Sequence, residues 1–186
     1  MRESSILNEG MNVWLVVLFA CGIVFMYINS GKGDTLERAI RCGCYDRERI
    51  RNGQWWRMVS VGFTHIQPWH LAMNLYALYN LRSLERVFGH AWYAVILFGS
   101  VAGGSLLEYV LSKTRYSVGL SGGLYGLMFS YVLLVIRLRS VSALRSVALT
   151  LALNAAINFM PGIAWQAHIG GALTGLVLTQ VFLLIH

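Results

Sequence analysis

The chain has 186 residues, of which 56% are hydrophobic and only 12% are charged. A soluble domain averages about 25% charged residues, so this composition favours a membrane protein built as a single domain over residues 1–186. The net charge of +7 does not indicate nucleic-acid binding. The basic residues lie between apolar segments, where they suit contact with anionic headgroups of membrane lipids.

A membrane-spanning helix needs about 20 mostly apolar residues. The first apolar segment is long enough to span, follows acidic residues and precedes no A-x-A cleavage site, so we expect a retained helix rather than a signal peptide. The one long connection, residues 31–67, mixes aromatic and charged residues, which predicts an ordered element at the bilayer interface. The sequence therefore predicts an all-α membrane protein with six transmembrane helices, at residues 12–29, 68–87, 91–111, 119–136, 143–160 and 164–185.

Polar groups within a bilayer are costly, so each is a candidate functional group. Those that stand out in the expected spans are His70 and Asn74 in the second, Ser121 in the fourth and His168 in the sixth. The three spans run in the same direction. At a rise of about 1.5 Å per residue, His70, Ser121 and His168 each lie about 22–24 Å from the far end of their span. We therefore expect these side chains at one depth, below the same membrane face.

A serine hydroxyl becomes a good nucleophile when a neighbouring base takes its proton, and His168 is at the depth of Ser121. Both aspartates, Asp34 and Asp46, fall in the long connection. A Ser-His-Asp triad within the spans is therefore excluded, and a Ser-His dyad is expected. His70 and Asn74, at i and i+4, share one helix face and can donate hydrogen bonds to an oxyanion.

Small residues let two membrane helices approach closely. The fourth and sixth spans contain many glycines: Gly119, Gly122, Gly123, Gly126, Gly170, Gly171 and Gly175. Taken singly, a G-x-S-G, a membrane histidine or a His/Asn pair is explained as well by helix packing as by catalysis. The Cys42–Cys44 pair lacks the second pair of a zinc site, and H-E-x-x-H is absent, so we expect no metal and no cofactor.

Taken together and in order, these motifs resemble the rhomboid family over about residues 40–180. The segment GQWWRMVSVGFTHIQPWHLAMN resembles the family's first loop and the start of its second helix, with the W-R pair Trp56-Arg57 and the H-x4-H-x3-N spacing of His65, His70 and Asn74. GLSGGLYG resembles the G-x-S-G nucleophile motif, and AHIGGALTG the family's A-H-x-x-G-x-x-x-G histidine motif.

The resemblance implies that Ser121 is the nucleophile and His168 the general base and acid of a serine endopeptidase. His70, Asn74 and the Ser121 backbone N–H would form the oxyanion hole, and Tyr125 would be the aromatic residue against which the histidine packs. The partners would be transmembrane protein substrates and membrane lipids. The chain would resemble the minimal six-helix prokaryotic type, a multi-pass protein of the cell (inner) membrane with cytoplasmic termini.

Two alternatives remain open. The first is a catalytically silent rhomboid-like protein that binds membrane segments. The second is a small transporter or proton channel that uses His70 and His168. The sequence does not reveal the oligomeric state, the substrate or the cleavage-site preference.

Overall fold

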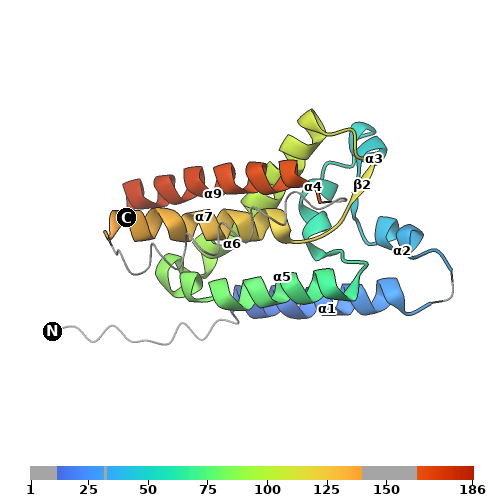
Figure 1. Ribbon diagram of the computed structural model, residues 1–186, viewed down its shortest axis with the longest axis horizontal. Coiled ribbons are helices and arrows are strands. Elements are labelled where there is room, and N and C mark those ends of the chain that lie inside the picture. The colour runs from blue at the N-terminus through green and yellow to red at the C-terminus, as the bar shows by residue number, and fades with distance from the viewer. Residues whose placement is uncertain (1–11, 32, 140–162) are drawn as a thin grey trace.

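The computed structural model describes residues 12–31, 33–139 and 163–186. Within these ranges the chain is mainly helical (Figure 1). The predicted fifth span, residues 143–160, lies outside the described residues. The helices that correspond to the other five predicted spans are α1 (Val13–Asn29), α5 (Pro68–Leu81), α6 (Ser83–Leu111), α7 (Ser121–Arg137) and α9 (Trp165–Ile185).

The predicted second span, residues 68–87, is divided between two helices. Helix α5 ends at Leu81, and α6 begins at Ser83 and contains a break at Gly89, where φ is 75° and ψ is 164°. Glycine adopts such a conformation without the steric cost that a Cβ would bring. The early turn lets the buried carboxylate of Glu85 accept hydrogen bonds from the backbone N–H groups of Val13 and Trp14, at 2.6 and 3.1 Å. A side chain of α6 thus caps the start of α1.

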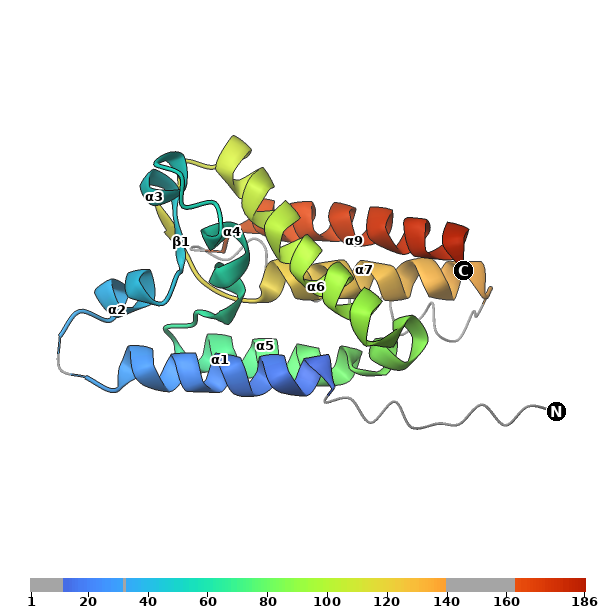
Figure 2. The ribbon, with the colours of Figure 1, turned by 180° about the vertical axis from the view of Figure 1, so that it is seen from behind.

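The helices form two groups. Helices α6, α7 and α9 pack against one another through the most extensive contacts in the structure. Helices α1 and α5 lie side by side next to this group, and α5 contacts α7 (Figures 1 and 2). This arrangement brings the N-terminal ends of α5, α7 and α9 to the same end of the molecule.

The connection between α1 and α5 folds into short elements at that same end (Figure 2). Asp34 caps α2 through the Leu36 N–H, and Asp46 caps α3 through the N–H groups of Glu48 and Arg49. Strand β1 pairs antiparallel with β2, which immediately precedes α7, and so ties the connection to the bundle. The elements are α2 (Thr35–Arg41), β1 (Tyr45–Asp46), α3 (Arg47–Arg51), α4 (Arg57–Ser60), the 3-10 turn η1 (Val61–Phe63) and β2 (Tyr116–Ser117).

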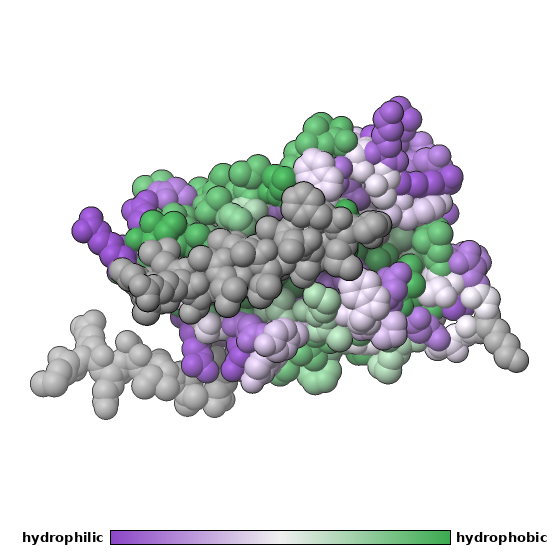
Figure 3. Space-filling model, viewed as in Figure 1, coloured by the Kyte–Doolittle hydropathy of each residue, from purple (hydrophilic) through white to green (hydrophobic). Residues whose placement is uncertain are grey.

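Hydrophobic side chains face outward along the helices. Figure 3 shows apolar surface over the middle of the molecule, with polar residues gathered towards its two ends. Among the described residues, α6 and α9 are long and apolar enough to cross a membrane, whereas α1 and α7 are shorter apolar helices of 17 residues. An apolar surface of this extent fits contact with lipid rather than water. Its strongly exposed members include Phe19, Ile23, Met26, Val110, Leu173, Val177 and Leu184.

Candidate active site

Ser121 and His168 meet at the start of two adjacent helices. Ser121 is the first residue of α7, and His168 lies in the first turn of α9. The distance between Ser121 Oγ and His168 Nε2 is 2.8 Å, and the histidine is buried. This distance lies within the range over which a base takes a proton from a hydroxyl group.

The two helices approach closely because glycine backbones face each other. A Cβ atom at Gly171 would lie 2.0 Å from the carbonyl oxygen of Gly122, far inside van der Waals contact. One turn further along, a Cβ at Gly175 would lie 2.3 Å from the carbonyl oxygen of Gly126. Only glycine therefore permits this separation of α7 and α9, and the separation sets the distance between Ser121 and His168.

The ring of Tyr125 lies flat against the imidazole of His168. Their ring centroids are 4.2 Å apart and their planes differ by 8°. Because Tyr125 is four residues after Ser121, both side chains project from the same face of α7. The stacked ring fixes the plane of the imidazole, which keeps Nε2 directed at Ser121 Oγ.

His70 of α5 reaches the backbone just before Ser121. Gly119 has a φ of +119°, and a Cβ at that position would lie 2.6 Å from His70 Cε1. The glycine is thus required both for the turn that enters α7 and for the close approach of the imidazole. On its other side, the His70 ring contacts the ring of His65, with centroids 5.2 Å apart.

Asn74 follows His70 by one helical turn and is buried. Its Nδ2 donates to the carbonyl oxygen of His70 at 2.8 Å, while Oδ1 makes no hydrogen bond with the described residues. A side-chain amide carries two N–H donors, so one donor of Asn74 remains for a ligand.

Trp56 and Arg57 support the connection rather than the dyad. The guanidinium of Arg57 is buried and donates to the carbonyl oxygens of Ile40 and Cys44, both at 2.9 Å, and to the Gln54 side chain at 2.7 Å. It also lies over the Trp56 ring, 4.6 Å from the centroid. Burial lowers the pKa of Arg57 from its ordinary value.

His65 is fully buried at the end of the same connection, and neither ring nitrogen has a hydrogen-bond partner among the described residues. Burial in the first place, and the neighbouring His70 in the second, lower the pKa of His65 to about 3. The imidazole is therefore neutral at physiological pH, and it serves as a packing surface for His70.

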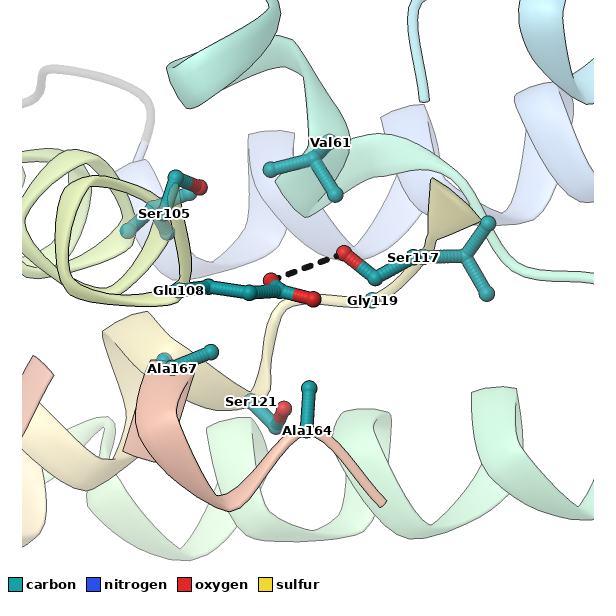
Figure 4. A pocket seen from close by; sticks show the side chains of 11 residues that line it. Val61, Ser105, Glu108, Ser117, Gly119, Ser121, Ala164 and Ala167 are labelled. Carbon is teal, nitrogen blue, oxygen red and sulfur yellow. Dashed lines mark hydrogen bonds between the residues drawn. The ribbon is translucent and has the colours of Figure 1, made fainter. Parts of the chain in front are cut away.

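The sequence reasoning missed Glu108 of α6, whose carboxyl group lines a pocket with Ser121. Figure 4 shows it between α6, the chain entering α7 and the start of α9. The residue is 1% exposed, and Ser117 Oγ donates to its Oε2 at 2.9 Å. An acidic residue in an apolar span is itself a signal of function, and that signal was available in the sequence.

Comparison with known proteins agrees with this geometry. The rhomboid domain model matches residues 52–185, which is most of the chain. The chain belongs to the rhomboid family. The resemblance inferred from the motifs is thereby confirmed, and with it the membrane character of the protein.

Several curated rhomboid relatives are similar in sequence. RHOMBOID-like protein 6, mitochondrial, from Arabidopsis thaliana is 34% identical over 158 residues, covering 81% of this chain and 50% of the relative. Rhomboid protease GluP from Bacillus subtilis is 26% identical over 182 residues, covering 93% of this chain and 35% of the relative. The chain thus spans half or less of the length of these two relatives.

The described residues contain no group of three or more His, Cys, Asp or Glu side chains arranged to hold a metal ion. The chemistry available at the site is therefore that of its own hydroxyl, imidazole, amide and carboxyl groups.

Proposed function

We propose that this rhomboid-family chain is an intramembrane serine endopeptidase that cleaves peptide bonds in or near the transmembrane segments of membrane proteins. The observation that carries the proposal is the 2.8 Å contact between Ser121 Oγ and His168 Nε2, with the imidazole stacked on Tyr125. A relative over 93% of the chain is named a rhomboid protease.

In the first half of the reaction, Ser121 Oγ bonds to the carbonyl carbon of the substrate while His168 Nε2 takes the hydroxyl proton. The carbon–nitrogen bond then breaks, and the imidazolium returns that proton to the leaving amine. In the second half, a water molecule attacks the acyl-enzyme and gives its proton to His168. The ester bond breaks, and Ser121 Oγ is reprotonated, so the dyad is restored without a cofactor.

The developing oxyanion needs hydrogen-bond donors aimed at its position. His70, the remaining amide donor of Asn74 and the backbone N–H of Ser121 are assigned this role. Their support is that His70 packs against Gly119, two residues before Ser121, and that Asn74 lies one turn further along α5.

The proposal includes a topology. The chain would cross the membrane six times, with residues 143–160 as the fifth span, both termini in the cytoplasm and the site opening to the outer side. The location would be a prokaryotic cell (inner) membrane.

The competing function is a catalytically silent rhomboid-like protein that binds membrane segments. It is disfavoured because a binding protein has no need for a serine hydroxyl at hydrogen-bond distance from an oriented imidazole.

The test is labelling with a serine-reactive fluorophosphonate, together with cleavage of a single-span model substrate. Wild-type protein should be labelled and should cleave the substrate, whereas Ser121→Ala and His168→Ala should do neither. Ser130→Ala is the matched control, because Ser130 lies on the same helix but bonds to Gly126 and Thr179. Cleavage that persists in Ser121→Ala, or an unlabelled wild type, would contradict the proposal.

A further inference from the structure

Glu108 is the acidic side chain in the wall of the pocket that contains Ser121. The pocket is formed by α6, β2, the turn into α7 and the first turn of α9 (Figure 4). A buried carboxyl group in a membrane helix is expensive, so its retention beside a nucleophile calls for a function.

The carboxyl group has hydrogen-bonding capacity left over. Its Oε2 accepts from Ser117 Oγ at 2.9 Å, while Oε1 is buried and has no partner among the described residues. Arg47, on α3, is the cation whose field reaches it, and Arg47 Nη1 donates instead to the carbonyl oxygen of Ser112. Oε1 can therefore accept a hydrogen bond from a group that enters the pocket.

The pocket is small and mixed in character. Apolar walls come from Val61, Val101, Ala164 and Ala167, and polar groups come from Ser105, Glu108 and Ser117. Its interior of about 30 Å³ holds about two water molecules, which is the size of a short side chain.

We propose that Glu108 is a specificity-determining residue that selects the side chain of the substrate residue whose carbonyl Ser121 attacks. That side chain branches from the carbon next to the attacked carbonyl, and the pocket begins at Ser121. Glu108 favours a small side chain with a hydrogen-bond donor, such as serine, and rejects a carboxylate. The inference rests on the proposed proteolytic function and deepens it.

The physical basis is the cost of an unpaired buried acceptor. A site built to hydrogen-bond a substrate hydroxyl discriminates strongly against an analogue without one, because the buried group of the site is then left without a partner. A substrate carboxylate would in addition be repelled by a like charge in a medium of low dielectric constant.

The experiment compares three single-span model substrates that differ only at the mapped cleavage residue, which is Ser, Ala or Asp. Rates are measured for full-length protein at alkaline pH, where the carboxyl group is ionised. Wild type should cleave the Ser substrate at least about 10-fold faster than the Ala substrate, and should cleave the Asp substrate most slowly. Equal wild-type rates for Ser and Ala would overturn the proposal without recourse to any variant.

Two variants separate charge from hydrogen bonding. Glu108→Gln should raise the relative rate for the Asp substrate by about 10-fold, because the repelling charge is removed. Glu108→Met should bring the Ser-to-Ala ratio close to 1, because the acceptor is removed. Glu48→Gln is the matched control and should leave all ratios unchanged, since Glu48 is exposed and paired with Arg115.

The alternative role for this pocket is storage of the water that hydrolyses the acyl-enzyme. In that case Glu108→Gln and Glu108→Met would slow all three substrates equally and leave the ratios as in wild type, which overturns the specificity proposal. Fluorophosphonate labelling of Ser121 checks that each variant retains the dyad. Failure of the proteolytic function itself would look different, since wild type would then cleave none of the substrates in a Ser121-dependent manner.

Discussion

Helices α7 and α9 contact each other through bare backbone, whereas the connection between α1 and α5 is stabilised by polar side chains. Between the helices, Gly171 meets the carbonyl oxygen of Gly122, and the shape of two backbones defines the contact. In the connection, the buried guanidinium of Arg57 links two carbonyl oxygens that lie far from it in sequence. One region depends on the absence of atoms, and the other on the presence of donors.

The difference predicts how each region responds to mutation. A backbone contact cannot absorb an added methyl group, so its failure should be abrupt and should reach the dyad. A hydrogen-bonded connection loses stability in steps as donors are removed. We therefore expect the catalytic geometry to depend on the helix contact far more than on the polar connection.

The largest effect is expected from Gly171→Ala. The added Cβ would lie 2.0 Å from the Gly122 carbonyl oxygen, so α7 and α9 must separate and Ser121 must move away from His168. We expect loss of fluorophosphonate labelling and a destabilisation of about 1–3 kcal/mol from overpacking, measured by thermal unfolding in detergent.

Gly22→Ala is the matched control for that substitution. Gly22 lies in the apolar helix α1, and a Cβ there would have no neighbour within 4 Å. Its activity should equal that of wild type, and its stability should be unchanged or slightly higher because alanine favours helix. Equal behaviour of the two variants would refute the role assigned to the glycine contact.

An intermediate effect is expected from Arg57→Lys. Lysine keeps the charge but loses the planar fork that reaches Ile40, Cys44 and Gln54 together. We expect a destabilisation of about 1.5–3 kcal/mol, the value of hydrogen bonds from a charged group, with Ser121 still labelled well below the unfolding temperature. Arg51→Lys, at an exposed position of α3, should change neither quantity. Loss of labelling in folded Arg57→Lys would show that the connection also shapes the dyad.

The smallest effect is expected from pH acting on His65. Its pKa is about 3 in the folded protein against an ordinary value of 6.5, so the unfolded chain binds the proton first as pH falls. The stabilisation is complete above about pH 6.5 and decreases towards pH 3, by up to about 1.4 kcal/mol per pH unit. His65→Leu should therefore show a shallower loss of melting temperature than wild type between pH 7.5 and pH 5. An identical slope in the two proteins would contradict the buried, neutral state of His65.

Much of the site could be predicted from the sequence because helices translate spacing into depth. With a constant rise per residue, His70, Ser121 and His168 were expected at one level, and the structure brings their helices together at that end. The rhomboid resemblance came from local motifs whose order along the chain is itself a sequence property, and the comparisons confirm it. The division of residues 68–87 at Leu81 was not predicted, because it depends on Glu85 reaching the start of α1.

The sequence by itself determined the membrane character, the positions of the apolar segments and the residue types available for catalysis. Only the tertiary structure decided which groups share a pocket. Glu108 lies 13 positions before Ser121 and on another helix, so neither helical periodicity nor motif spacing relates the two residues. Their meeting depends on how α6 crosses α7 and α9, and glycine contacts between backbones set that crossing.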